Sequence, residues 1–484
     1  MLLALSLPQA SRPGPSRTPA AAEDPLAPAA RARAAGDFVT ARRLYERALA
    51  ADPKNGRAAV GLAETLNDLK EFAAARELSE RLVASLPDRP EPPRALARAL
   101  LGLGRAKEAV EQAGRVVALD ANDLDARRLL AVAEIASGEP GRAVAELERV
   151  LAARPKDRAA LRALAGAYAA VGDARAEAAY QKLLAADPRD ASAREELAKY
   201  LWQERRYDDG NAQMDRVLEA FPGDAKRRAA YGMELAGQGR FGGAARQLDA
   251  ARRLGEESGD LLFYLGSALW EVGRLDEAEK WLREAARRNP EGVAPLHRLG
   301  RLLVFRGKAA DAIEPLSRAA ERAPASADVR LDLGRALEAA GKIPEAEAAY
   351  RKALELEPDL SVTHYTLGML LARSGRREEA QTHIALYRDH YQKEQEARFR
   401  AGARQAELNL GWTELAAGRA PNALEQFSRF PDDAQGLRGS AAALSKLGRH
   451  SDAVKALERA LLLAPDDPVL RYELDRERSA GGSP

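Results

Sequence analysis

Residues Gly259–Pro290 read GDLLFYLGSALWEVGRLDEAEKWLREAARRNP, and their apolar residues follow a helical spacing. Leucines and a glycine in the first half lie three and four residues apart, and the second half continues that spacing from Ala278. Gly273 separates the halves, and Pro290 ends the second because proline lacks the amide hydrogen that a helix interior requires. The stretch therefore predicts two helices joined by a turn, with Asp276 expected to cap the second helix.

This two-helix unit recurs along most of the chain. An alanine marks the same place in successive copies at a constant interval, except for a one-residue slip before Ala176 and a glycine, Gly210, in one copy. The marker alanines are Ala41, Ala75, Ala109, Ala143, Ala176, Ala244, Ala278, Ala312, Ala346 and Ala380. A period of about 34 residues is typical of a solenoid in which each copy buries its apolar face against its neighbours. The sequence therefore predicts an all-α solenoid of antiparallel helical hairpins.

The repeat resembles the tetratricopeptide repeat (TPR) family. The family's pattern of Leu-Gly, then alanine, then a closing proline is found, for example, at Leu299, Gly300, Ala312 and Pro324. About twelve or thirteen copies follow it in register, too many for a chance match. The resemblance implies a right-handed α-α superhelix in which the first helix of each pair lines a concave surface that binds proteins.

The N-terminal segment, residues 1–24, is rich in proline, serine and alanine and is expected to be disordered. A short apolar run from Leu2 to Leu7 has two interpretations. It is either the remnant of a signal peptide or a frayed cytosolic terminus, because the basic residues that begin a complete secretory signal are missing. The first interpretation favours an exported protein, periplasmic or extracellular, and the second a cytoplasmic one.

The repeats are interrupted once near the C-terminus. Ala423 is the next matching alanine after Ala380, but it comes nine residues later than the period predicts, and the intervening charged stretch is expected to extend a helix beyond the stack. The expected organisation is a TPR array of about 11 repeats over 25–392, a helical extension over 393–403, two further repeats over 404–467, a capping helix over 468–478 and a tail over 479–484.

Composition excludes several classes of function. The 75 basic and 73 acidic residues are interspersed and leave a net charge of +2, so no basic surface is expected to attract nucleic acid. The chain has no cysteine, which excludes disulfides, thiolate metal sites and a thiol nucleophile. It also lacks a run of 18 apolar residues, so no transmembrane segment is expected.

A partner-binding groove is predicted on the first helices of four consecutive copies. Its residues surround the Leu-Gly pairs and combine aromatic side chains with arginines, the types that dominate protein interfaces. They are Phe263, Ser267, Trp270, His297, Arg301, Phe305, Arg335, Tyr365, Met369 and Arg373. The alternative is that Phe263, Trp270 and Tyr365 only pack between adjacent hairpins. A second candidate, Trp202 with Glu195 and Lys199, lies earlier in the chain.

Motifs with catalytic or cofactor chemistry are weak. Gly237–Gly242 reads GQGRFG, but a dinucleotide fingerprint must follow a strand, and this one joins two expected helices. His383 and His390 are seven residues apart, which is about 10 Å along a helix and too far for one metal ion without other ligands. The sequence therefore predicts no catalytic residue, no cofactor and no metal site.

These observations predict a non-catalytic TPR scaffold that binds an extended peptide or a helix of a partner protein. Two alternatives remain open. One is an exported accessory subunit of an envelope or glycan-handling complex whose catalysis is supplied in trans. The other is a metal-dependent enzyme that uses His383 and His390.

Overall fold

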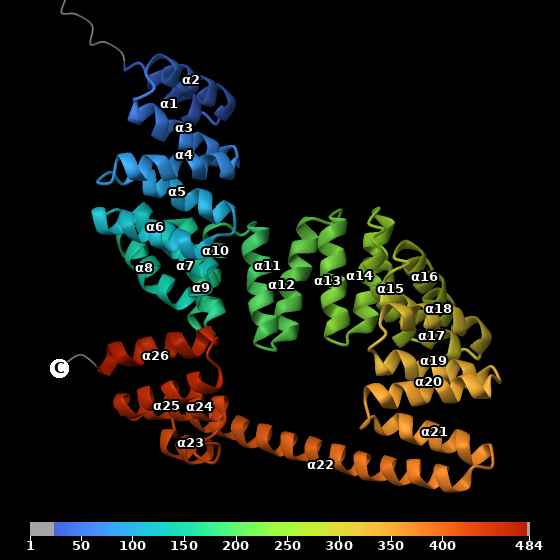
Figure 1. The fold of residues 1–484 in the computed structure, drawn as a ribbon. Coiled ribbons are helices and arrows are strands. Elements are labelled where there is room, and N and C mark those ends of the chain that lie inside the picture. Colours follow the sequence, from blue (N-terminus) through green and yellow to red (C-terminus); the bar gives the residue numbers. More distant parts are fainter. Residues whose placement is uncertain (1–23, 482–484) are drawn as a thin grey trace, which may run out of the picture. The chain divides into compact units, whose positions relative to one another are not determined.

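A computed structural model describes residues 24–481, which form 26 α-helices and no β-strand (Figure 1). The disordered segment expected over 1–24, with its apolar run, lies almost entirely outside these described residues. The first ten helices are α1 (Ala27–Ala34), α2 (Phe38–Ala51), α3 (Gly56–Asp68), α4 (Phe72–Ser85), α5 (Glu91–Gly102), α6 (Ala106–Leu119), α7 (Leu124–Ala136), α8 (Pro140–Ala153), α9 (Arg158–Ala170) and α10 (Arg175–Ala186).

The remaining helices continue the same alternation of first and second helices. They are α11 (Ala191–Gln203), α12 (Tyr207–Ala220), α13 (Ala225–Gly237), α14 (Phe241–Arg253), α15 (Gly259–Glu271), α16 (Leu275–Arg288), α17 (Val293–Phe305), α18 (Ala309–Arg322), α19 (Ala327–Ala339), α20 (Ile343–Leu356), α21 (Ser361–Arg373), α22 (Arg377–Ala416), α23 (Ala420–Phe427), α24 (Ala434–Lys446), α25 (His450–Leu463) and α26 (Pro468–Gly481).

The quoted stretch forms the hairpin of α15 and α16, and its turn depends on glycine. Gly273 adopts a φ of 80°, a left-handed conformation that side chains other than glycine rarely take. Asp276 was expected to cap α16, but this prediction was wrong, because Arg274 holds the cap position and Asp276 lies in the first turn. A carboxylate there still favours the helix, since it faces the positive end of the helix dipole.

The Leu-Gly pairs bring the two helices of a hairpin close together. A Cβ atom on Gly266 would lie 2.8 Å from Cγ of Leu282, and one on Gly334 would lie 2.5 Å from Cε1 of Tyr350. The buried leucines and alanines of α13–α22 form one continuous apolar cluster, to which each fully buried leucine contributes about 1.5–3 kcal/mol. The predicted all-α fold of stacked helical hairpins is therefore confirmed.

Packing divides the described chain into two compact units. One contains the residues up to Leu183 together with Asp466–Asp475, and the other contains Leu184–Pro465 with the residues after Asp475. The TPR array expected over residues 25–392 includes helices of both units. The boundary falls within α10, seven residues after the slip in the repeat period at Ala176.

One helix of the second unit is unusually long. α22 spans 40 residues, pairs with α21 at its beginning and with α23 at its end, and includes the stretch 393–403. It is thus the second helix of one hairpin and the first helix of the next. Only Ala380, Leu408 and Gly411 are buried along it, and Phe399 in its middle is 78% exposed. No helix among residues 24–481 is long and apolar enough to cross a membrane.

Candidate protein-binding groove

All ten predicted groove residues lie on the first helices of four consecutive hairpins, α15, α17, α19 and α21. These helices belong to the second unit and share its apolar cluster. A repeat of constant length returns each position to the same face of the next first helix, so side chains from neighbouring copies meet at regular intervals. The structure groups the predicted residues into three sets.

The first set, the tryptophan cluster, consists of Trp270, Arg298, Arg301 and Phe305. The ring centroids of Trp270 and Phe305 lie 6.0 Å apart, and the guanidinium of Arg298 lies 4.1 Å from the centroid of the Trp270 ring. Arg301 approaches the same ring at 5.9 Å. Phe305 is 66% exposed, whereas Trp270 is half-buried against the apolar cluster. The cluster therefore presents an aromatic surface whose rear side is fixed by packing.

The second set centres on Asp332 of α19, which is buried. His297 donates a hydrogen bond from Nε2 to Oδ2 of Asp332 at 2.8 Å, and Arg335 donates to Oδ1 at 3.0 Å. Arg301 lies 3.4 Å from the same carboxylate. Burial by itself would raise the pKa of Asp332, but the hydrogen bond from His297 and the nearby arginines hold it below its ordinary value. This carboxylate ties α17 to α19 and orients three of the predicted residues.

The third set, the tyrosine cluster, consists of Tyr365, Tyr387, Tyr391 and Met369. The rings of Tyr365 and Tyr387 lie 5.1 Å apart, and those of Tyr387 and Tyr391 lie 5.6 Å apart. Tyr365, Tyr391 and Met369 are all about two-fifths exposed. Because Tyr387 and Tyr391 come from α22, the second helix of the hairpin, inspection of first helices alone did not identify them.

The other predicted residues are less available to a partner. Phe263 is half-buried on the apolar cluster and makes an edge contact with Tyr264 at 5.3 Å. The hydroxyl of Ser267 is buried and makes no hydrogen bond within the described part of the chain. Arg373 forms an ion pair with Glu338, which also accepts a hydrogen bond from Tyr350. Of the three residues in the packing alternative, Phe263 and Trp270 are half-buried against the apolar cluster, whereas Tyr365 is 44% exposed.

The histidines lie close together but serve contacts within the protein. His364 Nε2 donates to the carbonyl of Pro358 at 2.9 Å, and its Nδ1 lies 2.9 Å from Nδ1 of His383. His390 stacks on His364 with a centroid distance of 5.6 Å. Burial and the neighbouring His364 lower the pKa of His383. A search of residues 24–481 finds no group of three His, Cys, Asp or Glu side chains arranged to hold a metal ion.

The GQGRFG segment forms the turn of a hairpin. α13 ends at Gly237 and α14 begins at Phe241, and Gly239 between them has a φ of 73°. A dinucleotide fingerprint requires a strand ahead of its glycines, and an α-helix stands there instead. The glycine in the middle of this segment has the ordinary role of a turn residue.

Antiparallel hairpins with Leu-Gly contacts that recur at a constant interval define a helical repeat protein. Sequence models of the tetratricopeptide repeat match residues 32–99, 100–168 and 339–404 in one form and 174–225, 231–293, 297–361 and 408–468 in another. These matches cover most of the chain. The chain therefore belongs to the TPR family, a family of interaction scaffolds that are generally non-catalytic.

Several solved structures are similar to parts of this chain. YrrB, described as a TPR protein with an unusual peptide-binding site, is 21% identical, covers 41% of this chain and 97% of its own, and has a TM-score of 0.35. MamA from Desulfovibrio magneticus RS-1 is 22% identical over 35% of this chain and 96% of its own, with a TM-score of 0.34. A second MamA, AMB-1, is 27% identical over 34% and 95%, with a TM-score of 0.31. The comparison with curated proteins returned no match.

Proposed function

We propose that the protein binds an extended peptide or a helix of a partner protein along α15, α17, α19 and α21, and that it performs no catalysis itself. The observation that carries the proposal is the tryptophan cluster. Phe305 is two-thirds exposed, yet it stands next to Trp270, which Arg298 holds from one side. Exposed aromatic side chains with a fixed rear side are typical of binding hot spots, because little conformational freedom is lost when a partner covers them.

The tyrosine cluster supports a contact that extends over several copies. Tyr365 and Met369 are exposed on α21, and between the two aromatic clusters α19 carries Glu338, paired with Arg373, and Asp332, bonded to His297. These charged groups are already paired within the protein, so a partner gains little from them. Specificity is therefore expected to come from the apolar anchors that the partner inserts at the two clusters.

The test replaces the exposed anchor and an equally exposed phenylalanine outside the groove. Phe305→Ala is expected to weaken capture of the native partners by a factor of about thirty, which corresponds to the loss of one hot spot of about 2 kcal/mol. Phe399→Ala is the matched control, because Phe399 is 78% exposed on α22 and belongs to neither cluster. Quantitative mass spectrometry of the captured proteins compares the two variants with the unchanged protein.

Thermal unfolding must show that both variants remain folded, and truncation of two exposed side chains is expected to change the melting temperature little. If the Phe305→Ala variant captures the partners as well as the Phe399→Ala variant does, the proposal is contradicted. In that case the partner binds elsewhere on the scaffold.

A further inference from the structure

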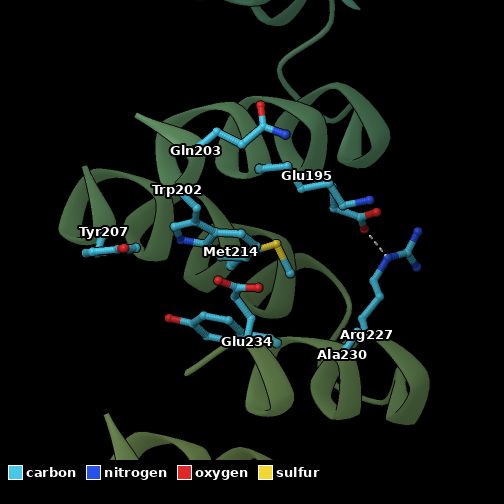
Figure 2. A pocket seen from close by; sticks show the side chains of 10 residues that line it. Glu195, Trp202, Gln203, Tyr207, Met214, Arg227, Ala230 and Glu234 are labelled. Atoms are coloured by element: carbon cyan, nitrogen blue, oxygen red, sulfur yellow. Dashed lines mark hydrogen bonds and ion pairs between the residues drawn. The ribbon is translucent and has the colours of Figure 1, made fainter. Parts of the chain in front are cut away.

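A pocket of about 540 Å³ opens between α11, α12 and α13, ahead of the groove helices in the chain but within the same unit (Figure 2). Its volume lies in the range of sites that bind small molecules or single side chains. Trp202 of α11, Tyr207 and Met214 of α12, and Tyr231 and Glu234 of α13 line it. α11 and α13 are first helices, as are the helices of the groove. No feature of the proposed groove is needed for the pocket, so the two sites are tested separately.

The pocket exists because two register positions carry unusually small residues. Ala230 lines the pocket and stands where the next copy has the much larger Tyr264, so its methyl side chain leaves room beside α13. Gly210 replaces the marker alanine, and a Cβ atom there would lie 2.5 Å from Cδ1 of Trp202. The glycine therefore allows the indole of Trp202 to lie against the backbone of α12 and form one wall of the pocket.

Hydrogen bonds fix this wall in place. Trp202 donates from Nε1 to Oδ1 of Asn211 at 3.0 Å, and Asn211 donates to Oε1 of Gln238 at 3.1 Å. Gln238 in turn donates to Oε1 of Glu234 at 3.1 Å. The ring of Tyr231 is nearly parallel to that of Trp202, with centroids 6.2 Å apart. The aromatic wall and the carboxylate of Glu234 thus belong to one connected network.

Glu234 occupies a position that other copies give to buried residues without charge. The residues in the same register of neighbouring copies are Tyr200, Ala268, Leu302, Ala336 and Leu370, and all of them are buried. A carboxylate there is costly unless it faces a cation or water. Figure 2 shows the carboxylate of Glu234 among the aromatic and Met214 side chains that line the pocket.

The charges of the pocket leave Glu234 without a cation. Arg227 forms ion pairs with Glu195 and with Asp224, both at 2.5 Å, so these groups largely satisfy one another; Figure 2 marks the first pair by a dashed line. Glu234 makes no ion pair with any residue of the described chain. Lys199 also lines the pocket, but it is exposed to solvent and forms no ion pair with Glu234. A positive group that enters beside Trp202 would therefore meet an unneutralised carboxylate.

We propose that this pocket binds the guanidinium group of an arginine side chain from a partner polypeptide, with Glu234 as its counter-ion and Trp202 as its stacking surface. A guanidinium is planar and weakly hydrated, so it stacks on an indole ring and donates to a carboxylate at the same time. A polypeptide is the favoured source because the pocket lies between first helices, the helices on which TPR proteins bind peptides. The protein thus binds a basic residue of its partner at a site separate from the groove on α15, α17, α19 and α21.

The test uses two pentapeptides that differ in one functional group. Acetyl-Gly-Gly-Arg-Gly-Gly-amide is compared with the same peptide containing citrulline, which has the shape of arginine without its charge. Titration of the full chain is followed by the indole N–H resonance of Trp202, which a Trp202→Phe variant assigns among the four tryptophans. The arginine peptide is expected to bind at least five times more tightly than the citrulline peptide, and equal binding would overturn the proposal.

Three variants and one control test the location of the site and the sign of the charge that it binds. Glu234→Gln is expected to weaken binding of the arginine peptide at least fivefold, while Glu394→Gln on α22 is the matched control and leaves it unchanged. Ala230→Tyr copies Tyr264 of the next copy and is expected to abolish binding by filling the pocket. Lys199→Ala removes a charge of the same sign as the arginine and is expected to strengthen binding of the peptide, whereas weaker binding after this change would contradict the proposed role of charge in the pocket.

A last experiment tests whether the guanidinium group belongs to a polypeptide or to a small molecule. Agmatine carries the same group without a peptide backbone, and it is expected to bind several times more weakly than the pentapeptide. Agmatine that binds as tightly as the pentapeptide would overturn the assignment to a polypeptide. Melting temperatures of all variants are measured alongside, and retained folding with lost binding in Glu234→Gln separates loss of the site from loss of structure.

Discussion

Trp202 and Trp270 occupy the same register of the repeat, two copies apart, yet they serve different surfaces. Trp202 lies over Gly210, is bonded through its indole nitrogen to Asn211, and forms the wall of a pocket. Trp270 lies beside Arg298 and the exposed ring of Phe305. The repeat therefore determines where a side chain stands, and the residues that surround it, in its own hairpin and in the next copy, determine whether it becomes a pocket wall or part of an open surface.

A second position of the repeat, in the apolar core, also carries an exceptional residue in one copy. Leucine is the usual residue there, and Glu134 of α7 replaces it in one copy. The leucines at this position are Leu66, Leu100, Leu201, Leu235, Leu269, Leu303, Leu337 and Leu371, and all are buried. Glu134 is buried as well, and its Oε2 atom has no hydrogen-bond partner in the described chain. Each exceptional residue can therefore be replaced by the residue that its neighbouring copies carry, and the effect of that substitution on stability can be measured.

The largest expected effect is a gain of stability from Glu134→Leu. Burial raises the pKa of Glu134 from 4.5 to about 7, so the folded protein binds more protons than the unfolded chain between these values. Its stability therefore falls as pH rises through about 7, and the loss corresponds to about 3 kcal/mol above pH 8. We expect Glu134→Leu to remove this loss, which hydrogen–deuterium exchange of α7 and α8 at pH 5 and pH 8.5 measures locally.

Two controls accompany this prediction. Glu134→Gln keeps the shape of the side chain without its charge, and it is expected to flatten the pH dependence even if packing gains are small. Glu139→Gln changes a less buried neighbour and is expected to leave the dependence in place. If the free energy of opening of α7, measured by exchange in the unchanged protein, is the same at both pH values, Glu134 does not destabilise the fold.

An intermediate effect is expected from Gly210→Ala, which restores the marker alanine of the other copies. The new methyl group would collide with the indole of Trp202, and such overpacking costs about 2 kcal/mol even though alanine favours the helix. Urea unfolding followed by tryptophan fluorescence measures the loss. The reverse change in the regular copy, Ala278→Gly, creates no collision and is expected to cost about 1 kcal/mol.

A double variant shows whether the collision is the cause. Trp202→Val copies Val304, the residue at the same register three copies later, and removes the ring that Gly210 accommodates. Gly210→Ala is then expected to become neutral or stabilising in the Trp202→Val background. An equal cost of Gly210→Ala in both backgrounds would indicate that the glycine is needed for the backbone of α12 and not for the tryptophan.

The sequence predicted the helices well because their signal is local and repeated. The Leu-Gly spacing and the closing prolines specify each hairpin, and the fold follows from stacking them. Contacts between copies also follow the period in part: His297 pairs with Asp332 of the next copy, and Arg373 pairs with Glu338 of the copy before it. Both pairs are separated by 35 residues, one more than the period, so such partners could have been found by examining the residues next to the position one period away.

The remaining features of the candidate sites depend on side chains that different helices place together, either within one hairpin or between neighbouring copies. Gly210 was noticed in the sequence as an exception, but nothing local links it to Trp202, eight residues earlier on another helix. The tyrosine cluster joins a first helix to a second helix, because α22 places Tyr387 beside Tyr365, and the prediction considered first helices alone. The role of Arg298 was missed because stacking on Trp270 depends on the rotamer of a long side chain, which spacing does not determine.

The smallest effect is expected from Arg298→Ala, which distinguishes the open tryptophan from the enclosed one. Arg298 lies 4.1 Å from the ring centroid of Trp270 and also donates to Glu271 at 2.5 Å. A partly exposed cation–π contact contributes about 1 kcal/mol, so the variant is expected to lose about that much of its free energy of unfolding. Arg298→Lys retains the charge without the planar stack and is expected to recover only part of the loss.

A double-mutant cycle with Trp270→Phe isolates the stack from the ion pair. If the arginine acts through the ring, the cost of Arg298→Ala falls when the indole is replaced by the smaller ring, because phenylalanine attracts a cation less strongly. The same cost in both backgrounds would assign the effect to Glu271 alone. The orientation of Trp270 would then depend on its packing against the apolar cluster alone, and the exposed ring of Phe305 on α17 would be what distinguishes its surroundings from the pocket of Trp202.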